Sequence, residues 1–330
     1  MLLKVAKKAQ VCEYADLWHP SRPSKVTRYP FVALESIVVD LPRITVVTPS
    51  FNQGNYLEQT IRSVLDQGYP NVEYIICDGG SKDQSVEIIN RYADRLAWWV
   101  SEKDKGQTDA INKGLGRGTG ELFTYINSDD TLEPGSLMAA AEAFRKGHDW
   151  VGGWAMFLEP GGGQWPQLPE PYEKRIDWFQ CNPISQQGTF WASRLTRELG
   201  PFREDMHYAF DYEFWMRMLF LGGTRPHVLR RCMGGYRLHD ASKTVSQYEK
   251  FRVEYKALRA EYWKYLTPDE QRVARARRRR WESEQHRLSG WRAIREGNIP
   301  VAREHAREAF RRQRTSLESW RLLYCALRGY

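Results

Sequence analysis

The sequence predicts an α/β protein with a mostly parallel sheet flanked by helices, followed by a C-terminal helical appendage. Three observations support this prediction. Apolar segments of strand length alternate with amphipathic helical segments from residue 44 to about residue 144. Crossovers of that length are right-handed and join parallel strands. From about residue 245 the pattern is continuously helical, and the 42% of hydrophobic residues suffice for a core.

The first half of the chain repeats strand and helix. Short runs of β-branched and aromatic residues predict strands, whereas apolar residues spaced three or four apart predict helices. Asp83 is suited to cap the second helix, and Pro134 stands at the start of the last one. The expected elements are strand 44–49, helix 55–66, strand 72–77, a helix capped by Asp83, strand 98–100, helix 108–115, strand 122–126 and helix 137–144.

The second half is less regular. The glycine- and proline-rich stretch 160–171 is expected to be a loop, and 212–221 an aromatic-rich helix. Residues 301–314 carry small residues at helix-packing spacing, which suggests a helical hairpin, although one unit is not a repeat array. We therefore divide the chain into an N-terminal extension (1–43), a central α/β domain (44–244) and a basic helical region (245–330).

Composition narrows the cellular setting. The five cysteines include no C-x-x-C pair, which argues against a disulfide framework or a zinc knuckle and favours a reducing compartment. No run of about 18 to 20 apolar residues is present, and the first residues lack the apolar core of a signal peptide. The expectation is a soluble cytoplasmic protein. Core packing is favoured over sugar stacking for most of the 13 tryptophans.

The net charge of +8 is concentrated in the tail. Residues 271–330 hold 16 Arg, no Lys and six acidic residues. The run Arg277–Arg280 is expected mainly to form a solvated helix face; peripheral contact with an anionic membrane at its inner face, or with an acidic partner, is the second hypothesis. No recognisable nucleic-acid-binding fold accompanies the run, so we expect no nucleic acid partner.

Polar loops follow three of the predicted strands. These loops are 49–52, 78–81 and 127–130, and ligands of such sheets bind at the carboxyl ends of the strands. The adjacent carboxylates Asp129 and Asp130 favour Mg²⁺ or Mn²⁺ carrying a diphosphate, with a helix cap as the alternative. Asp78 is suited to accept hydrogen bonds from a base or ribose, although an ordinary strand-to-helix turn with Asp83 as the cap is favoured when this loop is considered alone.

Two further residues are candidates for catalysis. Asp211 begins a helix among aromatic residues, where a carboxylate can act as a general base; a plain helix cap is the alternative. His239 ends a predicted strand and is a candidate for a metal or a phosphate, although a lone surface histidine is commoner. The glycine-rich segment 114–120 does not fit the dinucleotide-binding pattern and precedes a strand, and no P-loop motif is present.

Taken together, residues 44–244 resemble a family 2 glycosyltransferase with the GT-A fold. The resemblance is carried by six segments in order: 48–52, 78–81, 101–114, 127–130, the helix at Asp211, and 236–239. It implies inverting transfer of a sugar from a nucleotide diphosphate sugar, most often a UDP-sugar, to an acceptor hydroxyl. The sequence departs from the family pattern at Phe210, where the family usually has an acid. The expected base, Asp211, is present, but no acid stands beside it in the motif to support it.

The resemblance assigns roles residue by residue. Asp211 is the expected base, and Asp130, with His239 as a looser match, is expected to bind the divalent cation. Four aromatic residues are expected on the acceptor side: Trp191, Tyr208, Tyr212 and Trp215. The residues expected around the nucleotide sugar are Thr48, Pro49, Phe51, Asn52, Asp78, Gly106, Gln107, Asp109, Asn112 and Asp129.

The sequence alone leaves two alternative functions open. A nucleotidyltransferase would share the strand-end carboxylates but would want a basic loop after the first strand, and 50–55 contains no Lys or Arg. A non-catalytic scaffold that uses the basic tail is the second alternative. The resemblance further suggests a glycan or lipid-linked acceptor in cell-envelope polysaccharide synthesis. The sequence does not specify the donor sugar, the acceptor or the oligomeric state.

Overall fold

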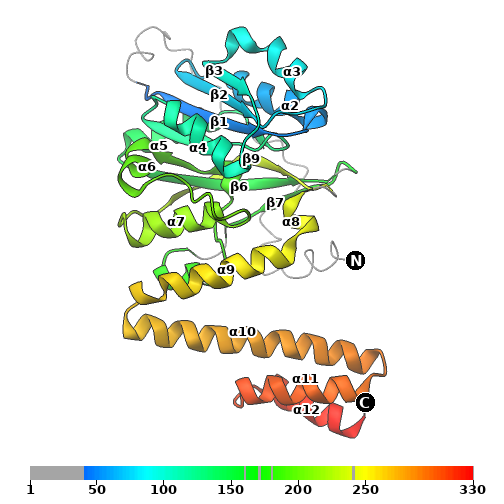
Figure 1. The fold of residues 1–330 in the computed structure, drawn as a ribbon. Helices are drawn as coiled ribbons and strands as arrows, with labels where there is room; N and C mark the ends of the chain where they lie inside the picture. Colours follow the sequence, from blue (N-terminus) through cyan, green and yellow to red (C-terminus); the bar gives the residue numbers. More distant parts are fainter. Residues whose placement is uncertain (1–40, 160, 170–171, 180, 240–241, 330) are drawn as a thin grey trace, which may run out of the picture. The chain divides into compact units, whose positions relative to one another are not determined.

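The computed structural model describes residues 41–159, 161–169, 172–179, 181–239 and 242–329. The predicted N-terminal extension, 1–43, therefore falls almost entirely outside the described residues. The rest contains one sheet of nine strands with helices packed on it, followed by further helices (Figure 1). An α/β fold with a helical C-terminal region is thereby confirmed.

Four parallel strands form one half of the sheet, in the order β3-β2-β1-β4. All seven residues of β1 are buried, because a parallel strand is covered on both faces and can be apolar throughout. The predicted strands and helices all occur here, and their ends differ from the predicted ends by at most two residues. Their bounds are β1 Ile44–Ser50, α2 Gly54–Leu65, β2 Val72–Asp78, α3 Ser85–Arg91, η4 Ala93–Arg95, β3 Trp98–Ser101, α4 Gln107–Arg117 and β4 Leu122–Tyr125.

The other half of the sheet is mixed. Strand β4 pairs antiparallel with β8, which pairs antiparallel with β6; β6 then pairs parallel with β9. The expectation of a mostly parallel sheet is confirmed for β1 to β4 and for the β6–β9 pair, whereas β5, β7 and β8 pair antiparallel with their neighbours. The remaining elements are β5 Thr131–Leu132, α5 Ser136–Arg145, β6 Trp150–Leu158, β7 Gln164–Gln167, η5 Arg175–Phe179, η6 Gln186–Gly188, β8 Phe190–Ala192, α6 Ser193–Leu199, α7 Phe210–Phe220 and β9 His227–Arg237.

The stretch predicted to be a loop, 160–171, contains strand β7. Strand β7 pairs antiparallel with the end of β6, so Phe157 lies opposite Trp165. Gly162 has a φ of 81°, and the amide of Glu159 donates to the carbonyl of Gly163 across the turn. The glycines therefore close a hairpin, and the cross-strand aromatic pair outweighs the low strand propensity of this stretch.

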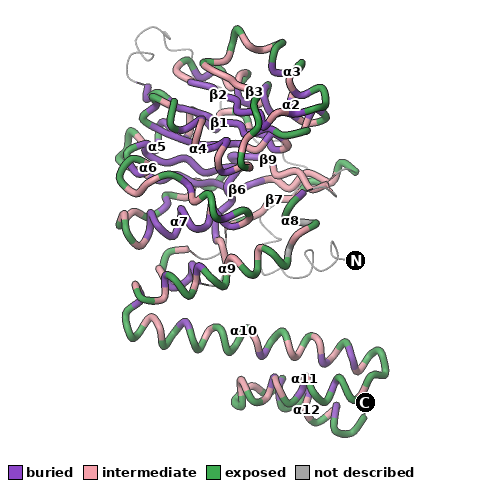
Figure 2. Tube along the Cα trace, in the orientation of Figure 1, coloured by how far each residue is buried: buried purple, intermediate pink, exposed green. Residues whose placement is uncertain are grey.

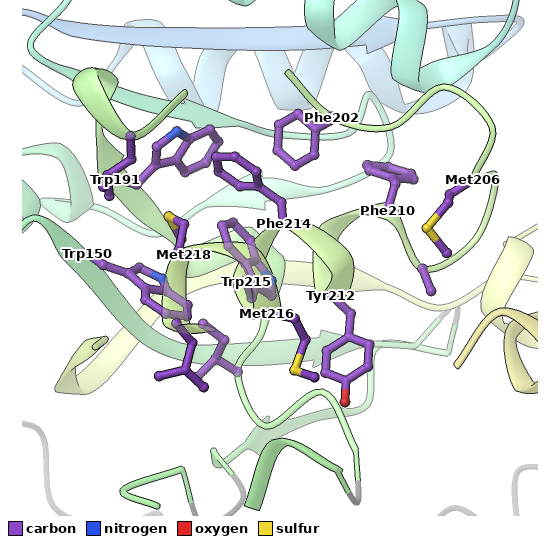
Figure 3. Packing of buried hydrophobic residues seen from close by; sticks show 14 of the residues in the cluster. Trp150, Trp191, Phe202, Met206, Phe210, Tyr212, Phe214, Trp215, Met216 and Met218 are labelled. Carbon is purple, nitrogen blue, oxygen red and sulfur yellow. The ribbon is translucent and has the colours of Figure 1, made fainter. Parts of the chain in front are cut away.

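A large aromatic core lies between the sheet and α7. Trp150, Trp191 and Trp215 are fully buried, and Trp215 stacks on Trp150 and packs edge to face against Trp191 (Figure 3). Strands β1, β2, β4 and β8 and helix α7 are correspondingly buried along most of their length (Figure 2). Together with Trp178, these residues confirm core packing for four of the 13 tryptophans.

A buried ion pair ties α7 to its surroundings. Arg217 Nη2 lies 2.7 Å from Glu213 Oε2, and the guanidinium also donates to the carbonyls of Leu199 and Pro201. The other oxygen of Glu213 accepts from the hydroxyl of Tyr262, on α9. Every partner of this pair is thus supplied by the protein, and removing one charge leaves the other buried without a counter-ion.

We expect Arg217→Ala to lower the free energy of unfolding by about 3–5 kcal/mol, the usual cost of leaving one member of a buried pair unpaired. Denaturant unfolding followed by far-UV circular dichroism measures the change. Arg252→Ala is the matched control, because its pair with Glu249 has side chains that are 59% and 76% exposed. That variant should change stability by less than about 1 kcal/mol. Equal effects in the two variants would contradict the structural importance of the buried pair.

The C-terminal region is helical as predicted. Thr267 and Glu270 form a capping box at the start of α10, and the small residues Ala302, Ala306 and Ala309 are the buried face of α11. Among the described residues, no helix combines the length and apolarity needed to cross a bilayer. The bounds are α8 Lys243–Ser246, α9 Tyr248–Tyr262, η7 Trp263–Tyr265, α10 Pro268–Arg295, α11 Ile299–Arg312 and α12 Leu317–Arg328.

The arginine run on α10 is partly engaged within the protein. Arg277 pairs with Asp177 of η5 at 2.5 Å, and Arg278 pairs with Glu282 one turn further along α10. Arg279 and Arg280 are exposed. Four consecutive residues point in four directions around a helix, so the run does not present a single basic face. Its first residue instead anchors α10 to the η5 segment.

Candidate active site

One cleft of about 850 Å³ lies at the carboxyl ends of the parallel strands. Residues that follow β1, β2 and β4 line it together, as the strand-end rule requires. Side chains from the second half of the chain, including α7, α8 and α9, complete its walls. The lining includes Pro49, Phe51, Gly79, Gly106, Gln107, Asn127, Asp129, Asp130, Asn182, Gln186, Gln187, Tyr208, Phe210, Asp211, Tyr236, Lys243, Gln247, Phe251 and Tyr255.

The loops after β1 and β2 present an aromatic ring and bare backbone to the cleft. Phe51 is 59% exposed, which is a high value for an apolar side chain. Gly79 has the carboxylate of Asp104 so close that an added Cβ would lie 2.7 Å from its oxygen. A flat, unpacked ring beside a glycine suits the stacking of a planar group such as a nucleobase.

Asp78 supports this loop rather than lining the cleft. The residue is 2% exposed, and its carboxylate accepts hydrogen bonds from the amides of Gly80 and Ser81 and from the hydroxyls of Ser81 and Ser101. The predicted direct contact with a base or ribose therefore has to be revised. With four donors already in place, the carboxylate fixes the turn that presents Gly79.

Four other predicted nucleotide-site residues are engaged in the framework. The hydroxyl of Thr48 is bonded to that of Tyr74, and Asn52 Oδ1 accepts from the amide of Lys82. Asp109 accepts from the amide of Lys105 at 3.1 Å. Asn112 both donates to and accepts from the backbone of Phe202. These side chains hold loops in place, so the structure assigns them support where the sequence suggested ligand contact.

Gly106 and Gln107 lie at the start of α4 and line the cleft. Gly106 has a φ of 127°, which a side chain would strain, and it brings the backbone to the helix start without a Cβ. Gln107 Nε2 donates to Asn127 Oδ1 at 2.6 Å, and its Oε1 accepts from the ammonium of Lys243 at 2.8 Å. This chain of contacts places a cation from α8 beside the carboxylates that follow β4.

Asp130 is the more deeply buried of the two adjacent acids, at 1% exposure. Its carboxylate accepts from Gln187 Nε2 at 2.9 Å, from Asn127 Nδ2 at 3.1 Å and from the amide of Arg237 at 3.0 Å. Burial, with the charge of Asp129 added, raises the pKa of Asp130 to about 8, although these three donors act in the opposite direction. The three donors therefore only partly offset the cost of ionising Asp130 beside Asp129.

Asp129 is paired with His239. The histidine Nε2 lies 3.0 Å from Asp129 Oδ2, and its ring packs on Tyr56 at 4.9 Å between centroids. The contact of His239 with a metal stays a prediction, and in this structure its Nε2 faces the carboxylate of Asp129, next to Asp130. Arg237 Nε donates to the backbone carbonyl of Asp129, so the end of β9 holds both acids in position.

The acids after β4 fit a cation that a substrate helps to bind. Within the described residues, no group of three or more His, Cys, Asp or Glu side chains gathers into a complete metal site. Mg²⁺ and Mn²⁺ bound to phosphates commonly use only one or two protein carboxylates, and the phosphate oxygens and water supply the rest. Asp130 matches that donor set, because burial and the charge of Asp129 disfavour its ionised form and a bound cation would stabilise it.

Asp211 lies at the start of α7 on the same cleft. Burial is the main cause that raises its pKa to about 6, and the charge of Glu254 adds to it, whereas hydrogen bonds from the backbone and from Asn182 oppose it. Asn182 Nδ2 donates to Asp211 Oδ2 at 3.2 Å. A carboxylate with a pKa of about 6 is ionised at neutral pH yet more basic than an ordinary aspartate, which suits a general base.

Glu254 on α9 holds the loop that carries this base. Its carboxylate accepts hydrogen bonds from three consecutive backbone amides: those of His207, Tyr208 and Ala209, at 2.9, 2.9 and 2.7 Å. Negative charge at the start of α7 is also favoured by the helix dipole. The sequence pattern could not reveal this contact, because Glu254 lies in the region beyond the recognised motifs.

The predicted acceptor-side aromatics divide into two groups. Tyr208 lines the cleft and donates to Gln247 Oε1 at 2.7 Å. Trp191, Tyr212 and Trp215 are fully buried in the aromatic core, and Tyr212 donates to the carbonyl of Trp178 (Figure 3). Direct contact of these three with an acceptor is therefore wrong for this structure. An i, i+3 or i+4 aromatic pattern on a helix marks the face that packs on the sheet.

Several lining residues were missed at the level of sequence. Asn182, Gln186 and Gln187 come from the irregular segment before β8, and Lys243, Gln247, Phe251 and Tyr255 come from α8 and α9. The only feature of the sequence that could have indicated these residues is the polarity of the segment 182–187 directly before an apolar strand. The helical region was predicted to be an appendage, yet its first two helices form part of the cleft.

Comparisons with known proteins give consistent matches. A family model described as glycosyl transferase family 2 matches residues 45–207. An uncharacterized glycosyltransferase of Mycobacterium tuberculosis is 30% identical over 179 residues, which cover 53% of this chain and 68% of that protein. The family-model match contains the strand-end loops 49–52, 78–81 and 127–130.

Two solved structures share the fold. S. aureus TarS 1-349, in complex with UDP-GlcNAc, matches with a TM-score of 0.51 and 19% identity, covering 86% of this chain and 79% of that one. The mannosyltransferase PcManGT from Pyrobaculum calidifontis, in complex with GDP-Man and Mn²⁺, matches with a TM-score of 0.55 and 18% identity, covering 89% and 82%. At these identities the likeness concerns the fold.

Proposed function

Because the chain belongs to the family 2 glycosyltransferases, we propose that it catalyses inverting, cation-assisted transfer of a sugar from a nucleotide diphosphate sugar to an acceptor hydroxyl. One observation carries the proposal: Asp129, Asp130 and Asp211, from distant parts of the sequence, line a single cleft. Family membership also favours a glycosyltransferase over the two alternative functions, a nucleotidyltransferase and a non-catalytic scaffold.

Each acid has a separate task in this reaction. Asp211 takes the proton of the acceptor hydroxyl as that oxygen attacks the anomeric carbon, and the bond to the diphosphate breaks on the opposite face, which inverts the configuration. Asp130 would hold Mg²⁺ or Mn²⁺, which supplies positive charge against the leaving diphosphate. Asp129, held by His239, is left to accept a hydroxyl of the ribose or of the sugar.

The rest of the cleft binds and orients the substrates. Phe51 and Gly79 are placed to receive the base, and Lys243 brings an ammonium near the acids, where it can offset diphosphate charge. Tyr208 and the aromatic residues of α9 offer apolar faces for the acceptor, which we propose is a glycan or a lipid-linked sugar. A UDP-sugar is the proposed donor, with a GDP-sugar as the second choice, because the two neighbours above carry those nucleotides.

A panel of sugar nucleotides tests the proposal. We expect slow hydrolysis of at least one UDP- or GDP-sugar, because water replaces a missing acceptor, and we expect EDTA to suppress it and Mn²⁺ or Mg²⁺ to restore it. Release of the nucleoside diphosphate, followed by chromatography, is the measurement. Activity that is indifferent to EDTA would contradict the role of the cation, and failure to bind or hydrolyse any member of the panel would contradict the proposed donor class.

A further inference from the structure

An aromatic ring occupies the position beside the base where the family usually has an acid. Phe210 is 4% exposed, and its ring packs on Tyr125 at 6.0 Å and on Phe202 at 5.8 Å between centroids. The phenylalanine side chain has neither a charge nor a hydrogen-bonding group to offer to Asp211. A second acid that supports the base has to come from another part of the chain.

Glu254 brings such a carboxylate to the base loop from α9. Its Oε1 accepts from the amide of His207, and its Oε2 accepts from the amides of Tyr208 and Ala209. Both oxygens are needed for this set of bonds, and a neutral amide side chain of the same length has only one oxygen that accepts. The carboxylate of Glu254 therefore fixes the backbone up to two residues before Asp211.

Helix α9 is anchored in the core, which gives Glu254 a defined position. Leu258 and Tyr262 follow Glu254 by four and eight residues, so the three side chains lie on one face of the helix. Leu258 is 1% exposed and Tyr262 is 2% exposed, and both belong to the same core cluster as α7. The hydroxyl of Tyr262 also donates to Glu213 of α7. One face of α9 thus meets both the loop before α7 and α7 itself.

Glu254 also acts on the base through its charge. Its negative charge disfavours ionisation of Asp211 and adds to burial in raising the pKa of that carboxyl. Tyr125 of β4 and Tyr255 of α9 also interact with Asp211, but burial raises the pKa of both well above the ordinary value of tyrosine, so they are neutral where Asp211 titrates. The contact from the segment before β8 is the neutral amide of Asn182. The effect of neighbouring charge on the base is thus that of Glu254.

We propose that Glu254 is the positioning residue of the base, and that it supplies from α9 the second carboxylate that the motif lacks at Phe210. This inference rests on the proposed function, because it concerns the group that deprotonates the acceptor. A general base has to lie within hydrogen-bond distance of the proton it removes, so a displaced loop lowers the rate steeply. Helix α9 is accordingly part of the catalytic machinery, although it lies beyond the family-model match at 45–207.

Glu254→Gln in the full-length protein tests the inference. The assay follows release of nucleoside diphosphate, with Mn²⁺ present and water as the acceptor, from the UDP- or GDP-sugar that the wild type hydrolyses fastest. We expect kcat to fall roughly 10- to 100-fold, because one amide oxygen cannot hold three backbone amides, whereas calorimetry should give the wild-type affinity for the free nucleoside diphosphate. The acid limb of the kcat/KM profile should move to lower pH, because loss of the negative charge lowers the pKa of Asp211.

Two further variants separate positioning of the base from general damage to α9. Glu254→Asp keeps the charge on a shorter side chain, so its acid limb should stay closer to that of the wild type and its kcat should lie between those of the wild type and Glu254→Gln. Glu249→Gln removes an acid from the same helix whose side chain is 76% exposed, and it should keep the wild-type rate and pH profile.

The outcomes distinguish this inference from the proposed function. A wild-type kcat in Glu254→Gln, or a lowered kcat with the acid limb unmoved, would overturn the role of Glu254 alone. If Glu254→Gln lacks the far-UV circular dichroism spectrum of the wild type, Glu254→Asp decides: a lowered kcat with unchanged nucleotide affinity supports the inference, and a wild-type kcat overturns it. Absence of sugar-nucleotide hydrolysis in the wild type would instead overturn the proposed function.

Discussion

Asp211→Asn lowers turnover of the preferred donor at least about a hundredfold, while the affinity for the nucleotide is unchanged. General-base assistance contributes roughly 10²–10⁴ in rate, and an asparagine amide of the same size cannot accept the proton. The nucleotide-side loops after β1 and β2 do not depend on Asp211. Steady-state release of nucleoside diphosphate in the presence of an acceptor gives the rate, and calorimetry with the free nucleotide gives the affinity.

The pH profile supplies an independent signature of the same residue. Since burial raises the pKa of Asp211 to about 6, the base is protonated below that pH and ionised above it. We therefore expect kcat/KM to fall about tenfold per pH unit below about pH 6 and to level off above it. Asp205→Asn is the control, because Asp205 lies in the same segment, pairs with Arg203 and has a side chain that is 66% exposed. Wild-type turnover in Asp211→Asn would refute the assignment.

Asp130→Asn should abolish the cation-dependent part of nucleotide binding and lower turnover by about a hundredfold or more. The cation supplies several kcal/mol of charge stabilisation to the leaving diphosphate, and each 1.36 kcal/mol is about a factor of ten in rate. The fold should tolerate this change. Burial and the charge of Asp129 raise the pKa of Asp130, which favours the neutral form of the side chain when no cation is bound, and asparagine is a neutral side chain of the same size.

Calorimetry of nucleoside diphosphate binding with Mn²⁺ and with EDTA measures this effect. In the wild type the two titrations should differ, and in Asp130→Asn they should coincide. Asp66→Asn serves as the control, since that acid lies at the end of α2 with a side chain that is 50% exposed, and it should retain the wild-type difference. A cation response that survives in Asp130→Asn would show that other groups bind the metal.

The framework of the donor half of the cleft could be predicted from sequence because it depends on local patterns. Periodicities of two and 3.6 residues identify β1 to β4 and the helices between them, and right-handed crossovers then bring the ends of those strands to one edge. This is why the loops at 49–52 and 127–130 were correctly expected on the same site. The pairing of β6, β8 and β9 has no such local signal, since antiparallel and parallel partners give similar strand patterns.

Individual roles within the site depended on packing that a sequence does not display. Asp78 has the motif position of a ligand, but two serines and two backbone amides surround its carboxylate. Trp191 and Trp215 have the chemistry of sugar-stacking residues, yet they are 0% exposed in the aromatic core. Whether a side chain faces solvent or core is decided by neighbours distant in the sequence.

What the sequence determined by itself is the α/β architecture of 44–144, the family resemblance and the three acids Asp129, Asp130 and Asp211. What only the tertiary structure decided is the far wall of the cleft: Glu254 on the base loop, His239 on Asp129, and Asn182 on Asp211. The physical reason is the separation of the interacting residues along the chain. The periodicity of strands and helices depends on residues that are close in sequence, whereas the hydrogen bonds that orient these side chains join residues tens to more than a hundred positions apart.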